Sequence, residues 1–285
     1  MQMAGLLDED ADPLWVSQFH GMHGQDEDGP RWRRTLVAID HSDHVVGCAS
    51  VAVNQVHSSR LPCAIDVAPS CRRRGVGGLL LAEIMRQRPY VAPLSTKVRP
   101  LNVAAQAFIA QAGGTAYQRC PGAVIDPADT CVARWAQSQA TNRCASFSDQ
   151  SAEALTSAFA EQYWWVHQRW SPVKDSAVLQ KMAAEEIAEI DPAVSAGTWS
   201  DGRLVAAAFA FPVASGFEVV AETVVEDYPQ GVDVLGEAIA AVVRAAGRQG
   251  ALLQFDGHVS DPHLHRVIST LPWCHSEPLD LIEVR

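Results

Sequence analysis

The stretch VAPSCRRRGVGG, residues 67–78, combines residue types that can hold a phosphate group. Its glycines let the backbone approach an anion closely, because a Cβ there would push the anion away. The apolar run that follows predicts a helix over 75–88, and the first N–H groups of a helix attract negative charge. We therefore predict an anion-binding loop, formed by Arg72, Arg73, Arg74, Gly75, Val76, Gly77 and Gly78.

Two common phosphate-binding signatures are absent from this loop. The Walker A pattern needs a Lys followed by Ser or Thr after its last glycine, where Leu79 and Leu80 stand. The dinucleotide fingerprint G-x-G-x-x-G also fails, because Leu80 stands three residues beyond Gly77. The pattern that remains is R-x-x-G-x-G, preceded by Val67, Ala68 and Pro69.

The elements that must position the loop follow an α/β pattern. Alternating β-branched runs predict strands, and the spacing of Leu80, Leu81, Ile84 and Met85 predicts a helix with one face against a sheet. A short helix is possible near residues 14–19. The expected order is β-β-β-α-β-α-β, with a hairpin over 34–55, strands over 61–69 and 93–99, helices over 75–88 and 102–112, and a last strand at 115–120 or 123–127.

The second half repeats this order at a period of roughly 140 residues. We expect helices over 151–170 and 176–190, strands over 197–211, 216–225, 251–257 and 278–284, and helices over 234–247 and 262–271. We therefore predict a tandem duplication with domains at residues 1–140 and 141–285. Each domain would be an α/β fold with a mixed central sheet flanked by helices.

The loop resembles the signature of the GNAT superfamily, the acyl-CoA-dependent N-acyltransferases. The family pattern V-x-P-x-x-[RQ]-x-x-G-x-[GA] is met by Val67, Pro69, Arg72, Gly75 and Gly77. A further family feature, an asparagine that opens the next helix, is matched by Asn102. The resemblance is strong over residues 31–120 and weak beyond, so it indicates two tandem GNAT-like domains, of which the second is degenerate.

The resemblance implies that acetyl-CoA is the acyl donor. No residues stand at a familiar metal-ligand spacing, so we expect no metal cofactor. In the family the loop amides hold the pyrophosphate, and the backbone at Val67 and Ala68 pairs with the pantetheine arm. The asparagine that matches Asn102 contacts the cofactor. Arg73 and Arg74 would add charge-assisted hydrogen bonds to phosphate oxygens.

The chain departs from the family at the positions that assist the reaction. Where many members carry a Glu on the third strand, this sequence has Arg60, Leu61 and Pro62, so Asp66 is the nearest carboxylate. The position of the usual Tyr donor is Ile109, and Tyr117 is the only nearby phenol. Asp66 and Tyr117 are therefore the candidate catalytic residues, although orientation of the amine alone can supply much of the rate acceleration.

The second half lacks the loop signature at the equivalent position. Asp227 and Asp233 stand there instead and would repel a pyrophosphate. We expect it to supply packing and an acceptor site, for which Trp164, His167 and Glu222 are the candidates. The aromatic stretch around Trp164 is more typical of core or interdomain packing than of an acceptor pocket. The run FDGHVSDPHLH has no familiar metal-ligand spacing, so we interpret it as a polar loop.

Charge and composition indicate which classes of binding partner the protein has. The net charge is −11 overall, but residues 31–140 sum to +7 and residues 141–285 to −11, which favours an anion in the first half and a cation in the second. No basic stripe continues beyond the loop, so we expect no nucleic-acid partner. No apolar run is long enough to span a bilayer and no leader pattern is present, so we expect a cytoplasmic protein without a membrane partner. Only three of the 22 basic residues are lysine and alanine is abundant, a bias that suggests a GC-rich bacterial genome.

These observations predict an N-acetyltransferase that moves an acetyl group from acetyl-CoA directly to an amine of a small, cationic molecule such as an antibiotic or an amino metabolite. The missing Glu and Tyr leave open a non-catalytic acyl-CoA-binding protein. An acyltransferase or decarboxylase that uses another acyl-CoA is also open. The sequence does not identify the acceptor, the acyl length or the oligomeric state.

Overall fold

The computed structural model describes residue 22 and residues 24–285, so the short helix predicted near residues 14–19 lies outside the described residues. The chain forms two compact units. Unit 1 ends at Tyr117 and also contains Leu281–Arg285, whereas unit 2 contains Gln118–Asp280. This division differs from the predicted boundary after residue 140, because residues 118–140 pack with unit 2.

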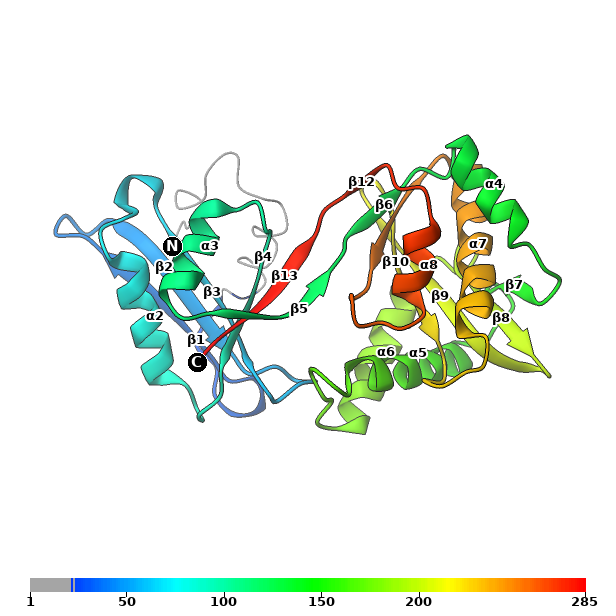
Figure 1. Cartoon of the computed structure of the whole chain (residues 1–285). Helices are drawn as coiled ribbons and strands as arrows, with labels where there is room; N and C mark the ends of the chain where they lie inside the picture. The colour runs from blue at the N-terminus through cyan, green and yellow to red at the C-terminus, as the bar shows by residue number, and fades with distance from the viewer. Residues whose placement is uncertain (1–21, 23) are drawn as a thin grey trace. The chain divides into compact units, whose positions relative to one another are not determined.

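The sheet of unit 1 runs in the order β1-β2-β3-β4-β13-β5 (Figure 1). The first three strands are antiparallel neighbours, and β3 pairs with β4 in parallel. The strands are β1 (Arg33–Ile39), β2 (Val45–Ala52), β3 (Leu61–Val67), β4 (Leu94–Val98), β5 (Thr115–Cys120) and β13 (Leu279–Val284).

Two α-helices of unit 1, α2 (Val76–Gln87) and α3 (Val103–Gln111), follow β3 and β4, and short 3-10 helices cover Gly29–Arg31 and Pro69–Cys71. The predicted apolar face of α2 is confirmed. Leu80 and Ile84, one helical turn apart, are buried, and Leu81 and Met85 pack against the same core.

The last strand of the chain does not lie where the repeat predicts it. Strand β13 was expected in the second domain, but it is inserted between β4 and β5 of unit 1, where Figure 1 shows it in red. Its apolar residues Ile282 and Val284 join the core of unit 1. The alternation of apolar and polar residues along a strand predicts which face is buried, but it does not identify the neighbouring strand. The sequence therefore could not predict that β13 joins the sheet of unit 1.

The sheet of unit 2 runs in the order β12-β6-β11-β10-β9-β8-β7. Its strands are β6 (Ala123–Ile125), β7 (Cys144–Ser146), β8 (Ala196–Ser200), β9 (Arg203–Val213), β10 (Gly216–Thr223), β11 (Leu252–Asp256) and β12 (His275–Ser276). Its helices are α4 (Thr130–Ser138), α5 (Ala152–His167), α6 (Ser176–Glu189), α7 (Gly231–Gln249) and α8 (Leu264–Thr270).

The two faces of β9 carry different packing layers. Ala206 and Ala208 are fully buried in the core cluster that contains most of α7. Phe209, on the alternate face, meets Phe159 of α5 with ring centroids 5.3 Å apart. Each unit is thus a mixed sheet flanked by helices, as predicted.

No helix among the described residues combines the length and apolar character needed to cross a membrane.

Candidate functional site

Strands β3 and β4 diverge soon after they meet. Their parallel pairing is confined to Leu61 with Leu94 and Pro62 with Ser95. Beyond Pro62, β3 continues to Val67 along β2 alone. The two strands therefore form a splay, with its closed end at Leu61 and its open end at Val67.

The predicted anion-binding loop lies at the open end of this splay. It leads from β3 through the 3-10 helix Pro69–Cys71 to Gly75, the N-cap of α2, which adopts φ +86°. This left-handed conformation favours glycine over other residues. Arg73 also has positive φ, at +63°, so the chain turns sharply just before the first free N–H groups of α2.

The loop glycines differ in the space around them. A Cβ added to Gly78 would meet no atom of the described residues within 4 Å, whereas a Cβ at Gly77 would lie 3.3 Å from the Phe108 ring of α3. Gly77 therefore lets α2 and α3 approach each other, and Gly78 leaves the start of α2 open. Both observations fit a helix start that a phosphate group can approach.

The loop arginines take two different places. Arg72 folds back on β3, where its Nε donates to the Val67 carbonyl at 2.9 Å and its Nη2 lies 3.8 Å from Asp66 Oδ1. Arg73 and Arg74 are exposed. Arg72 thus shapes the end of the strand, while its two neighbours carry the positive charge at the surface.

Asn102 begins α3, and its side-chain oxygen accepts a hydrogen bond from the Ala105 N–H at 3.1 Å. This N-cap stabilises the helix and leaves the side-chain amide group as a donor. Ile109, at the position where the family carries its Tyr, is buried in the core of unit 1.

The two candidate catalytic residues lie at opposite ends of the splay. Asp66 is buried near the open end, and its Oδ1 accepts from the Val67 N–H at 2.8 Å. Asp66 lies five residue steps along β3 from Leu61, a distance of roughly 16 Å. Tyr117 of β5 instead contacts Arg60, the residue that precedes Leu61 at the closed end.

In unit 2 the equivalent position is filled by side chains. Glu222, near the end of β10 and 1% exposed, accepts at Oε1 from the Thr223 N–H and from His263 Nδ1, each at 2.8 Å. Its Oε2 accepts from the backbone N–H groups of His263 and Leu264. Glu222 therefore anchors the start of α8 from within the protein.

The imidazole of His263 also lies against the start of α7. A Cβ added to Gly231, the first residue of α7, would come within 2.4 Å of the His263 ring. The Trp165 indole donates to the Thr223 carbonyl at 3.2 Å, at the end of β10. The helix start that could attract an anion is thus covered by an imidazole.

The three predicted acceptor residues have different surroundings in unit 2. Trp164 is 38% exposed on α5. His167 is buried, stacked on Tyr163 with ring centroids 3.9 Å apart and next to Trp170. Glu222 is engaged with His263. His167 and Glu222 therefore have packing and hydrogen-bonding roles that the sequence pattern did not separate from binding.

The histidine-rich loop of unit 2 forms pairs with carboxylates. His258 Nδ1 lies 3.3 Å from Asp261 Oδ2, and His263 pairs with Glu222. Burial lowers the pKa of His258, but hydrogen bonds to Asp261 and Cys120 outweigh it and raise the pKa to about 10. Across the described residues, no three His, Cys, Asp or Glu side chains are grouped to hold a metal ion.

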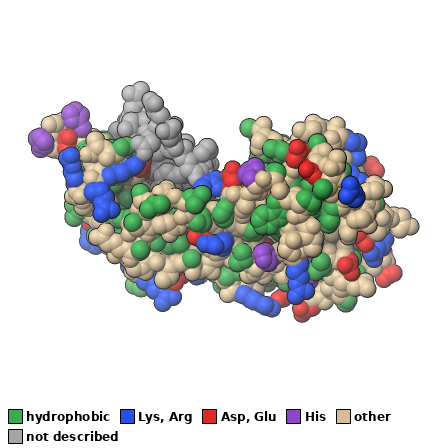
Figure 2. All heavy atoms as spheres, turned by 45° about the horizontal axis from the view of Figure 1, so that its top comes forward, with side chains coloured by type: hydrophobic (Ala, Val, Ile, Leu, Met, Phe, Trp, Pro, Cys, Tyr) green, Lys and Arg blue, Asp and Glu red, His purple; other side chains and the backbone are tan. Residues whose placement is uncertain are grey.

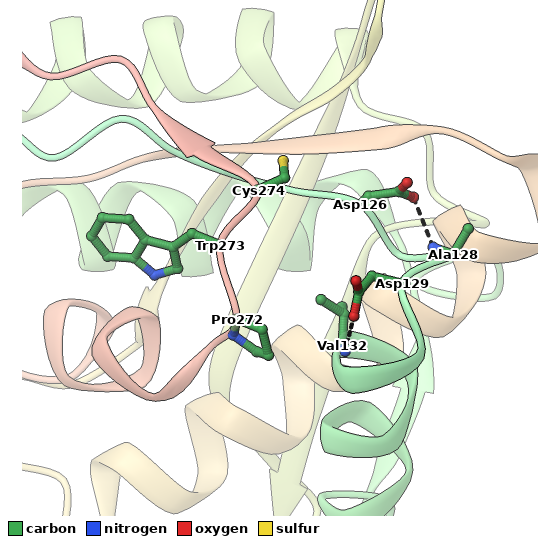
Figure 3. Close-up of a pocket in the computed structure, with 7 residues that line it drawn as sticks. All are labelled: Asp126, Ala128, Asp129, Val132, Pro272, Trp273 and Cys274. Carbon is green, nitrogen blue, oxygen red and sulfur yellow. Dashed lines mark hydrogen bonds between the residues drawn. The ribbon is translucent and has the colours of Figure 1, made fainter.

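A hollow of about 240 Å³ lies beside the N-terminus of α4 in unit 2 (Figure 3). Its two carboxylates have structural partners, since Asp126 accepts from the Ala128 N–H and Asp129 accepts from the Val132 N–H as the cap of α4. Trp273, also at its edge, donates to the Ile268 carbonyl.

On the face drawn in Figure 2, Lys and Arg side chains lie in small separate groups.

Comparison with known proteins identifies the class of fold. Residues 6–113 match the model of the acetyltransferase (GNAT) family. This segment therefore resembles a GNAT acetyltransferase domain, a likeness that favours acyl transfer as the general class of activity. No curated protein matches the chain in sequence.

Solved structures extend the likeness over both units. A GCN5-related N-acetyltransferase from Sphaerobacter thermophilus is 16% identical with a TM-score of 0.58, over 100% of this chain and 89% of the other. A GNAT-family acetyltransferase from Colwellia psychrerythraea is 13% identical with a TM-score of 0.58, over 96% and 90%. A tandem GNAT protein of the clavulanic acid biosynthesis pathway is 15% identical with a TM-score of 0.55, over 90% and 84%. The fold is thus that of two GNAT-like domains.

Sequence reasoning did not find three residues that shape these sites. Arg60 and Glu283 meet beside the closed end of the splay, and His263 covers the helix start in unit 2. Glu283 was hidden because its strand was assigned to the other domain. His263 could have been found, since it precedes its helix as Asn102 precedes α3.

Proposed function

We propose that unit 1 binds acetyl-CoA, or a related short acyl-CoA, and that the protein transfers the acyl group to an amine of a small cationic molecule. The observation that carries this proposal is the splay of β3 from β4 with an open, glycine-bearing helix start at its wide end. The residues present fit such a cofactor, because the Gly78 position has space for a phosphate and exposed arginines stand beside it.

The loop amides from Gly75 to Gly78 would hold the pyrophosphate, and Arg73, Arg74 and Asn102 would add donors. The backbone of β3 beyond Pro62, at Val67 and Ala68 in particular, would pair with the pantetheine arm. Acetyl-CoA supplies an activated thioester carbonyl. The net charge of −11 supports a cationic acceptor, because an acidic protein attracts cations from solution.

The cofactor proposal is tested at Gly78, where an added Cβ has no described neighbour within 4 Å. We expect Gly78→Asp to abolish CoA binding in isothermal titration calorimetry, because a carboxylate would stand where the pyrophosphate lies. The matched control is Gly78→Ala, which adds a Cβ without charge and should retain binding within about tenfold. Unchanged affinity in the Asp variant would refute the proposed site.

A non-catalytic acyl-CoA-binding protein is the second candidate. It is favoured by Leu61 and Ile109, two apolar residues buried in the core where the family carries a Glu and a Tyr. Thiol release from acetyl-CoA separates the two functions, with an aminoglycoside, a polyamine and a peptide with a free amino terminus as acceptors. Release above background with any of them supports transfer, and CoA binding without release supports the second candidate.

A further inference from the structure

A cluster of charged and aromatic side chains lies beside the closed end of the splay in unit 1. Arg60 Nε donates to Glu283 Oε2 at 2.8 Å, and the Arg60 guanidinium carbon lies 3.7 Å from the centre of the Tyr117 ring. The other Glu283 oxygen accepts from Arg285 Nε at 3.0 Å. These contacts join the segment before β3 to β13 and β5.

The cluster lies on the sheet face opposite the apolar core of unit 1. Ile282 and Val284 pack in that core, so Glu283 between them points to the other face. Leu61 is likewise in the core, and Arg60 precedes it. Because β3 and β5 are three strand spacings apart, roughly 14 Å, the two long side chains meet above β4 and β13.

The charge state of Glu283 decides what it can do. Burial alone would raise the pKa of this carboxyl group, but hydrogen bonds from Arg60 and Arg285 outweigh burial and hold the pKa below its usual value. A carboxylate with a lowered pKa is a weak general base. With its side chain only 8% exposed, Glu283 is suited to fix the orientation of Arg60.

We propose that Arg60, held by Glu283, positions the Tyr117 phenol as the proton donor to the leaving thiolate. The inference rests on the proposed acyl transfer. In that step the amine nitrogen forms the new C–N bond and the thioester C–S bond breaks. The sulfur takes the phenol proton, the amine loses a proton to water, and the phenolate regains one from water. Tyr117 is then the catalytic residue, whereas Arg60 and Glu283 are positioning residues supplied in part by the last strand.

The first readout needs no bound cofactor. The chain has four tyrosines, so 3-fluorotyrosine labelling gives a ¹⁹F NMR spectrum in which Tyr117→Phe identifies one resonance. We expect Arg60→Met and Glu283→Gln to shift and broaden the Tyr117 resonance. The matched control is Arg86→Lys, at an exposed ion pair with Glu83 on α2, and it should leave that resonance in place.

The second readout is thiol release from acetyl-CoA with the most active amine of the panel above. We expect Tyr117→Phe to lower kcat by about 100-fold, as loss of a general acid does. Arg60→Met and Glu283→Gln should each lower kcat by about tenfold or more, with the KM for acetyl-CoA unchanged, because misplacement of a reacting group slows the reaction without loosening binding. Arg60→Lys should recover part of kcat, and Tyr90→Phe, at an exposed tyrosine, should match the parent protein.

The outcomes separate this inference from the proposed function. A parent protein that neither binds CoA nor releases thiol overturns the proposed function. An active parent protein with unchanged kcat in Arg60→Met and Glu283→Gln overturns the positioning role alone. An unmoved Tyr117 resonance in both variants does the same, whatever the activity.

Discussion

Helix α2 follows β3 in unit 1, and α7 follows β10 in unit 2. The two helices begin with the same backbone turn, but the surroundings of the helix start differ between the units. Gly75 and Gln230, the N-caps of α2 and α7, both adopt left-handed backbone conformations. In unit 1 none of the described residues covers the helix start at Gly78, whereas in unit 2 the His263 ring lies against Gly231. The same backbone turn therefore precedes an uncovered helix start in the described part of unit 1 and a helix start packed against a side chain in unit 2.

The difference between the two helix starts comes from the N-cap residue of the next helix, which is Asn102 for α3 in unit 1 and His263 for α8 in unit 2. Asn102 turns its side chain to the N–H of Ala105 in its own helix, so it leaves α2 uncovered. His263 makes no such cap and instead bonds Glu222. Because a buried carboxylate needs partners, Glu222 and His263 stabilise each other and keep the imidazole in place.

The largest effect that tests this comparison is expected from Glu222→Gln. The substitution keeps the shape of the side chain but removes the charge that accepts hydrogen bonds from the N–H groups of Thr223, His263 and Leu264. We expect unit 2 to lose about 3 kcal/mol of unfolding free energy. Urea denaturation followed by segment-resolved hydrogen exchange measures the loss for each unit.

The matched control for that substitution is Glu226→Gln, at an exposed carboxylate paired with Arg169 in the loop before α7. It should change the stability of unit 2 by less than about 0.5 kcal/mol. Equal effects of the two substitutions would show that Glu222 does not anchor His263.

The next largest expected effect is a pH dependence of the unfolding free energy of unit 2. His258 is stabilised in its charged form beside Asp261, so its pKa of about 10 lies well above the unfolded value. The resulting stability is full below about pH 6.5 and is lost as the pH rises toward 10, with a size on the order of a few kcal/mol.

The groups that face the His258 ring are Asp261, Cys120, His167 and Trp170. We expect His258→Gln to flatten the decline in unit 2 stability between pH 7 and 10, while His44→Gln, at an exposed hairpin histidine, leaves it unchanged. Thermal unfolding across this pH range provides the measurement. A decline that persists in His258→Gln would assign it to another group.

The sequence predicted the α/β class, the tandem plan and the element order around the loop, because these depend on local periodicity and on glycine and proline placement. It did not predict that β13 lies between β4 and β5, since alternation sets a buried face and not a partner strand. For the same reason the meeting of Arg60 with Glu283 was hidden. The pairing of Glu222, a candidate acceptor residue, with His263 could not be predicted either, because the two residues lie 41 positions apart in the sequence.

The smallest effects are opposite responses of two glycines to the same change. Gly78→Ala adds a Cβ in open space within a helix, so we expect unit 1 to gain about 0.5–1 kcal/mol. Gly231→Ala places a Cβ within 2.4 Å of the His263 ring, so we expect unit 2 to lose about 1–2 kcal/mol. Segment-resolved hydrogen exchange separates the two units in each variant.

The double variant Gly231→Ala with His263→Ala sharpens this test. Removing the imidazole relieves the clash, so alanine at residue 231 should cost less in the His263→Ala background than in the parent protein. Asp233 stays in the first turn of α7 in this variant. We therefore expect calorimetry to give one CoA per chain before and after the change, because removing the ring uncovers the helix start without removing the carboxylate that repels a phosphate. A second CoA bound by the double variant would mean that His263 alone distinguishes the two units.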